Sequence, residues 1–222
     1  MLQILSDLSI FSSVQGMFGL IVASFTTIIS VVNPLAATPV FLTLTRNDTD
    51  KERFQQAKRS IIYMFFILLV FLFLGTFILQ FFGISLPGIR IAGGLIIMRA
   101  GYSMMDPSDG GKKLSPAVRA DAMEKADISL SPMAMPILAG PGSIAACIGL
   151  GSQTTFATDY ISLTISLVLV SLVTFSVLSI APKAVKYMGA SGLTVMTRMM
   201  GFLALSIGVQ FIISGISRYF EI

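Results

Sequence analysis

Two short segments of the chain combine proline or glycine with groups that can hydrogen-bond a small solute. The first is Ser30-Val-Val-Asn33-Pro34-Leu-Ala-Ala-Thr38-Pro39, and the second is Pro136-Ile-Leu-Ala-Gly140-Pro141-Gly142-Ser143. Proline removes a helix donor and clashes with the preceding turn, and glycine weakens a helix, so each segment should interrupt its apolar helix. Interruption leaves free N–H groups at one half-helix end, which suit a carboxylate, and free carbonyls at the other, which suit a cation. Two such breaks facing each other would suit a zwitterion.

The side chains at the breaks add to this chemistry. An amide and two hydroxyls can hydrogen-bond a ligand, and small residues leave room for one. The alternative is a pair of kinked helices that only pack. The predicted substrate-binding residues are Asn33, Pro34, Ala36, Thr38, Gly140, Pro141, Gly142 and Ser143.

The elements that must position these breaks are membrane spans. The chain is 55% hydrophobic and only 12% charged, and residues 61–82 and 161–181 carry no charge at all. Each of these two runs is long enough to cross about 30 Å of hydrocarbon. The predicted fold is an all-α membrane protein of six transmembrane helices, the first and fourth of them broken, in a single membrane domain of residues 1–222. The expected spans are residues 17–45, 60–82, 87–105, 129–151, 160–182 and 194–217.

The basic residues predict the orientation. Twelve of the 15 Lys and Arg residues lie in or beside the segments 46–59, 106–128 and 183–193, whereas the opposite side has only Arg90 and Arg218. The positive-inside rule then places these three segments in the cytoplasm and both termini outside the plasma (inner) membrane. The net charge of +4 therefore reports topology and gives no reason to expect a nucleic-acid partner.

The chain also resembles itself at an offset of 107 residues. Pro34 then aligns with Pro141, and Gly94 and Gly101 align with Gly201 and Gly208. We expect a first three-span repeat at 1–105, a cytoplasmic linker at 106–128 and a second repeat at 129–222. Three spans per repeat give the two repeats opposite orientations, which is the inverted topology of many secondary transporters.

Two further features of the spans favour packing or gating. Gly94 and Gly101, and likewise Gly201 and Gly208, recur every seven residues and so share one helix face, where small residues let membrane helices approach closely. Arg99 is charged within the third span, and two interpretations stay open: it lines a cavity, or it extends to the cytoplasmic surface. Arg90 and Arg198 open their spans and are interpreted as interfacial anchors.

Catalysis is not expected. Gly189-Ala190-Ser191-Gly192 fits the Gly-x-Ser-Gly motif of rhomboid-type intramembrane proteases, but that chemistry needs a histidine base and the chain has no histidine. One cysteine and the lack of an acidic cluster within the spans argue against a metal site, and no cofactor is predicted.

Three motifs resemble those of the MarC family of integral membrane proteins, which is grouped with small neutral amino acid transporters. Asn33-Pro34-Leu-Ala-Ala-Thr-Pro39-Val-Phe41 is similar to the family's Asn-Pro-x-Gly-x-x-Pro-x-Phe, with Ala36 in place of the usual glycine. Pro132-Met-Ala-Met-Pro136-Ile-Leu-Ala139-Gly140-Pro141-Gly142-Ser-Ile144 is similar to its Pro-Leu-Ala-x-Pro-x-x-Ala-Gly-Pro-Gly-x-Ile. Arg198-Met-Met-Gly201, followed by Gly208-Val-Gln210-Phe211, is similar to its last span.

This resemblance implies transport of small neutral amino acids such as glycine or alanine, with substrate at the two breaks. The predicted function is a secondary transporter working by alternating access. The alternatives are an exporter or channel for another small solute, and a membrane scaffold that transports nothing. The expected partners are the amino acid and the lipid bilayer, while the coupling ion and assembly into a homo-oligomer stay open.

Overall fold

The computed structural model describes residues 2–106, 127–154 and 156–220, and all of its regular elements there are helical. The predicted linker at 106–128 lies outside the described residues except at its ends. The elements in chain order are α1 (Leu2–Val32), α2 (Pro34–Leu44), α3 (Asp50–Phe81), α4 (Leu86–Met105), η2 (Ser129–Leu138), α6 (Pro141–Gly151) and α7 (Ala157–Phe220).

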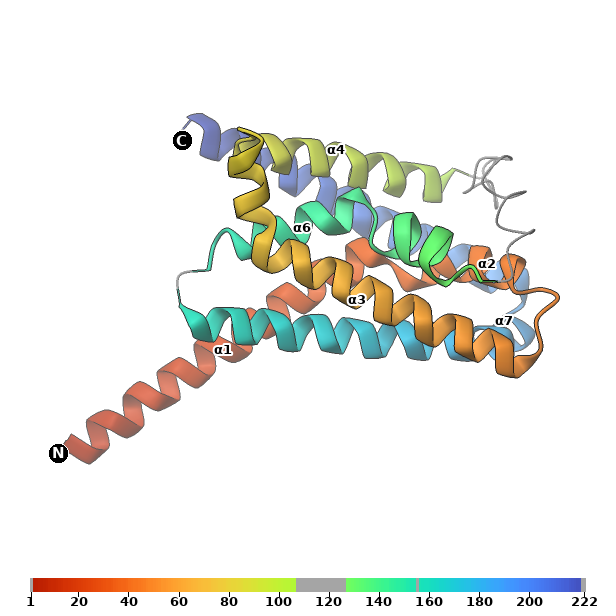
Figure 1. Ribbon diagram of the computed structural model, residues 1–222, viewed down its shortest axis with the longest axis horizontal. Coiled ribbons are helices and arrows are strands. Elements are labelled where there is room, and N and C mark those ends of the chain that lie inside the picture. Colours follow the sequence, from red (N-terminus) through yellow and green to blue (C-terminus); the bar gives the residue numbers. More distant parts are fainter. Residues whose placement is uncertain (1, 107–126, 155, 221–222) are drawn as a thin grey trace.

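The chain runs back and forth along one direction (Figure 1). Helices α1 and α2 run from one end of the molecule to the other, α3 returns and α4 crosses again. The η2 and α6 segments return together, and α7 runs out and then back. The start of α1 and the end of α7 therefore lie at the same end, together with the turn at 82–85 and the end of α6, whereas the turn at 45–49 lies at the opposite end.

Four stretches of the described residues are long and apolar enough to cross a membrane, namely Gly16–Leu44, Asp50–Phe81, Ala157–Ala184 and Thr194–Phe220. The η2 and α6 pair, bent by 63°, makes a fifth if it counts as one span. Helix α4 is 20 residues long but is not among them. It carries two arginines and several glycines, which lower its hydropathy. An all-helical membrane protein is thus confirmed, while the six-span count stays a prediction.

Helix α3 begins ten residues before the predicted span of 60–82, because a polar capping box starts it. The Thr49 hydroxyl accepts from the Glu52 amide, and the Glu52 carboxylate accepts from the Thr49 amide at 2.8 Å. Such reciprocal caps satisfy donors that a helix start leaves free. The hydrophobic run alone therefore located the apolar part of the helix and missed its polar first turns.

The structure corrects the predicted loop at 183–193. These residues are helical, and α7 is assigned as one helix from Ala157 to Phe220. Figure 1 shows that α7 nevertheless reverses direction between its two membrane-length halves. Pro182 lies just before this reversal, where it has no N–H to donate to a helical hydrogen bond.

The buried core lies among α1, α2, α3, η2, α6 and the first half of α7. Its largest fully buried side chains include Phe41, Met64, Leu68, Leu138 and Leu167. Large apolar side chains also cover the outside, among them Phe66, Phe77 and Leu172, each more than half exposed. An apolar exterior of this extent suits a protein surrounded by lipid.

Polar contacts connect the two halves of the chain. Ser24 on α1 lies 2.7 Å from Ser166 on α7, hydroxyl to hydroxyl. At the other end, the Ser129 hydroxyl donates to the Gln56 side chain at 2.6 Å. Asp127 pairs with Arg59 at 2.8 Å, and hydrogen bonds from Ser129 together with the Arg59 charge lower the pKa of Asp127. These contacts fix the start of η2 against α3.

Candidate functional site

The first predicted break lies at Asn33, between α1 and α2. Asn33 has φ 48°, in the left-handed region that asparagine tolerates better than most residues, and Pro34 opens α2. The Asn33 side chain is 5% exposed. Its Oδ1 accepts from the Ala36 amide at 3.2 Å, and its Nδ2 lies 3.6 Å from the Met104 sulfur on α4. Asn33 thus caps α2 and connects it to α4.

Asn33→Ala is expected to destabilise the protein by about 2 kcal/mol, because it removes the helix cap and places a side chain that disfavours positive φ there. Asn33→Gly should be milder, since glycine adopts this conformation freely. Melting temperatures of the purified variants measure the difference. Equal losses for alanine and glycine would show that the amide contacts matter more than the backbone conformation.

The second break is wider than the sequence indicates. Helix α6 begins at Pro141, as predicted, but Ser131 and Met135 within η2 also have extended backbone angles, and the bonds preceding Pro132 and Pro136 are cis. Gly140 caps α6 without a side chain to accept from the first turn. Among the described residues, the backbone amides of Gly142 and Ser143 donate no hydrogen bond. The first turn of α6 therefore presents free N–H groups in the interior.

The two breaks lie next to each other. A Cβ placed on Gly142 would lie 3.3 Å from Cγ1 of Val31, in the last turn of α1 before Asn33. It would lie 2.7 Å from Cγ1 of Ile97 on α4. Ile97 and Met104 are seven residues apart and both buried, so one face of α4 covers both breaks. Sequence reasoning missed these two residues, although each lies three residues after a glycine of the stripe.

The remaining predicted substrate residues are placed as follows. The Thr38 hydroxyl is buried and donates to the Pro34 carbonyl at 2.9 Å, within its own helix. The Ser143 hydroxyl donates to the Leu138 carbonyl at 2.9 Å and thereby joins the two sides of the second break. Ala36 is half-buried in the first turn of α2, and Pro141 is exposed. Of the two hydroxyls predicted as ligands, that of Ser143 bridges a break, whereas that of Thr38 is bonded within α2.

The glycine stripe forms a direct contact between α4 and the second half of α7. A Cβ on Gly94 would lie 2.6 Å from the Gly208 carbonyl oxygen, and one on Gly101 would lie 2.6 Å from that of Gly201. Only glycine allows two backbones to come this close. Arg99 lies on the same helix with its side chain exposed, which favours the surface over a cavity lining.

A groove of about 480 Å³ lies elsewhere, between α3 and the first half of α7. It is lined mainly by apolar side chains such as Phe54, Phe65 and Phe175, and none of the predicted substrate residues borders it. Over the described parts of the chain, no cluster of three His, Cys, Asp or Glu residues could hold a metal ion. Ser191 of the protease-like motif is helical in α7, and its side chain lies outside what the structure describes.

Apolar helices around two adjacent interruptions define a helical integral membrane protein with discontinuous spans. Residues 18–220 match the profile of the MarC family integral membrane protein, and the chain belongs to that family. The family predicted from the three motifs is therefore confirmed.

Relatives align over most of their length. A UPF0056 membrane protein of Methanocaldococcus jannaschii is 37% identical over 195 residues, covering 88% of this chain and 95% of that protein. YvbG of Bacillus subtilis, also a UPF0056 membrane protein, is 32% identical over 93% of this chain and 98% of its own. The UPF0056 inner membrane protein MarC of Escherichia coli is 35% identical over 85% of this chain and 90% of its own. No solved structure matches.

Proposed function

We propose that this protein is a secondary transporter of small neutral amino acids that binds its substrate between the two breaks. The observation that carries the proposal is the contact between them: the first turn of α6, at Gly142, packs on the last turn of α1. Buried polar backbone without partners is unfavourable in a membrane, and it is tolerated where it lines a cavity or meets a ligand.

The substrate's two charges would be divided between the breaks. The amides of Gly142 and Ser143, at the partly positive end of α6, suit a carboxylate. The carbonyls at the end of α1, beside Asn33, suit an ammonium group. Ile97 and Val31 pack directly against Gly142, so a ligand between the breaks would have to displace them, and a glycine- or alanine-sized ligand would displace them least.

Alternating access would rest on a six-span inverted repeat, which the element bounds support. Helices α2 and α6 begin at residues 34 and 141 and end at 44 and 151, and α3 and α7 begin at 50 and 157, an offset of 107 throughout. The same offset relates the two glycine contacts to each other. Gly94 corresponds to Gly201 and Gly101 corresponds to Gly208, so the contact Gly94–Gly208 is the counterpart of Gly201–Gly101. A self-complementary contact of this kind is what a two-fold relation produces. In this proposal α4 spans the membrane beside α7, and one repeat rocks against the other.

Ligand-dependent stabilisation tests the function. A ligand that binds only the folded state raises the melting temperature, so glycine or alanine should stabilise the purified protein more than leucine or phenylalanine. Flux into proteoliposomes should saturate with substrate. Conductance without saturation would indicate a channel, and no stabilisation by any amino acid together with no flux would indicate a scaffold.

The proposed orientation places both termini outside and residues 45–49 in the cytoplasm. Cys147, the one native cysteine, is fully buried, so single introduced cysteines give clean labelling. An impermeant maleimide applied to intact cells should label Ile84→Cys, near the termini, and should label Asn47→Cys only after permeabilisation. The reverse pattern would invert the topology and leave the site unchanged.

A further inference from the structure

Arg90, near the start of α4, is a buried arginine without an acidic partner among the residues that the structure describes. Its side chain is only 7% exposed, although the sequence suggests an interfacial anchor. Arg198, interpreted in the same way, is exposed. An arginine within a span that faces the protein interior is unfavourable unless something compensates its charge, and such residues mark ligand or ion pathways.

The described residues do not supply that compensation. The single hydrogen bond of the Arg90 guanidinium goes from Nη1 to the Ser214 hydroxyl on α7, at 3.1 Å, and Ser214 is neutral. Both ion pairs within the described structure involve other residues. Arg218 also acts on Arg90, and because its charge is positive it repels Arg90. A guanidinium has five N–H donors, so most of them stay available.

The neighbouring Gly149 carbonyl at the end of α6 accepts no hydrogen bond from Arg90 either. An added Cβ on Gly149 would contact Arg90. The carbonyl of Gly149 already accepts from the Ser152 hydroxyl at 2.8 Å and from the Gln153 side-chain amide at 2.9 Å. The α6 end is therefore capped by its own following residues, and the guanidinium keeps its unused donors.

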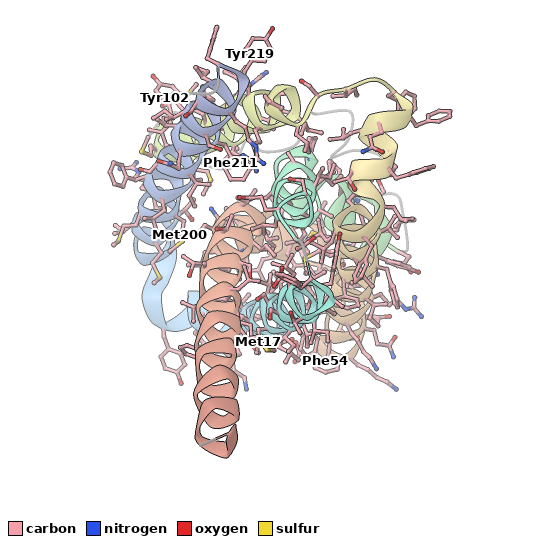
Figure 2. The ribbon with its side chains drawn as sticks, turned by 90° about the vertical axis from the view of Figure 1, so that its left-hand side faces the viewer. Met17, Phe54, Tyr102, Met200, Phe211 and Tyr219 are labelled. Atoms are coloured by element: carbon pink, nitrogen blue, oxygen red, sulfur yellow. The ribbon has the colours of Figure 1, made fainter. Side chains whose placement is uncertain are left out.

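The packing beside the Arg90 guanidinium is looser than elsewhere on α6. A Cβ placed on Gly149 would lie 3.9 Å from Nε of Arg90 and 4.0 Å from Cε1 of Phe211, with nothing closer. This contrasts with the other buried glycines of α6 and the stripe, where the same atom would collide. Figure 2 shows Phe211 on the second half of α7, turned toward α6, whereas Tyr102 and Tyr219 lie on the outer side. One added carbon would thus fit between Gly149, Arg90 and Phe211 in ordinary van der Waals contact.

We propose that Arg90 binds the carboxylate of the transported amino acid at the end of the protein that carries the termini, before the substrate reaches the breaks. Planar guanidinium groups match carboxylates with two parallel hydrogen bonds. Gly149 lies seven residues, or about 10 Å of helix, from Gly142, so the same helix connects the two positions. The inference rests on the proposed function only for the identity of the ligand; the site itself is a carboxylate site.

Acetate tests the site without relying on transport. Adding sodium acetate to the purified full chain should raise its melting temperature by about 3–6 °C at roughly ten times its dissociation constant. Equal concentrations of acetamide, which lacks the charge, and of sodium chloride should raise it less. Arg90→Met replaces a buried charge by an apolar side chain of similar length, and it should lose the acetate-specific shift. Arg198→Met, the matched control at an exposed arginine, should keep it.

Several outcomes would overturn the inference. Equal acetate shifts in the wild type and in Arg90→Met would do so, and so would no acetate shift in the wild type. A chloride shift as large as that of acetate would overturn the carboxylate assignment. If Arg90→Met does not fold, Arg90→Lys keeps the charge without the planar fork and should show a smaller shift. An acetate shift without any amino acid binding would reject the proposed function while keeping this site.

Discussion

Gly142→Val is expected to abolish uptake while the protein stays folded in the membrane. Its Cβ would lie 2.7 Å from Cγ1 of Ile97 and 3.3 Å from Cγ1 of Val31, and valine adds two further methyl groups to this point. The branched side chain would overlap Ile97 and Val31 between the breaks, and side chains forced into a packed interior cost about 1–3 kcal/mol. Uptake should fall at least about tenfold, which corresponds to 1.4 kcal/mol.

The matched control is Gly19→Val on α1, where an added Cβ would meet nothing within 4 Å. This variant should transport like the wild type. Gly142→Ala should lose part of the uptake, because its added carbon meets Ile97 first. The double variant Gly142→Ala/Ile97→Ala removes that obstacle and should regain part of the lost uptake. Radiolabelled uptake, normalised to the amount of protein in the membrane, measures all four variants. Full uptake by Gly142→Val would mean that substrate does not pass between the breaks.

Gly208→Ala is expected to destabilise the whole protein, because it separates α4 from α7. The three atoms nearest to its added Cβ are the Met98 amide nitrogen at 2.6 Å, the Gly94 carbonyl oxygen at 2.7 Å and the Met98 Cα at 2.9 Å. All three are backbone atoms, so no side chain can rotate away and the helices must move apart. The expected loss is about 1–3 kcal/mol, or a melting temperature lower by about 2–12 °C.

Gly19→Ala is expected to change the stability of the protein in the opposite direction. It lies on an exposed face of α1 with open space around it, and alanine favours a helix over glycine by about 0.5–1 kcal/mol. Thermal unfolding in detergent should therefore show Gly208→Ala below the wild type and Gly19→Ala at or above it. If Gly208→Ala were stabilised as well as Gly19→Ala, the contact between α4 and α7 would be looser than the structure shows.

The breaks were predictable because they depend on local chemistry. Proline at residues 34 and 141 opens a helix wherever it stands in an apolar segment, and both half-helices begin there. The glycine stripe was likewise visible as a seven-residue period, and the family followed from three motifs. The helical turn at 183–193 was missed because glycine and serine suggest a loop, whereas the backbone there stays helical while changing direction.

The sequence by itself determined where the apolar helices are interrupted, because interruption depends on residues adjacent in the chain. Only the tertiary structure decided which side chains meet those interruptions. Met104 reaches Asn33, and Ile97 reaches Gly142, across separations of 71 and 45 residues that no local pattern encodes. The same holds for Arg90, whose position at a span end looks interfacial in the sequence. The packing of α4 against α6 and α7 is what removes it from the surface, since burial is a property of the neighbours.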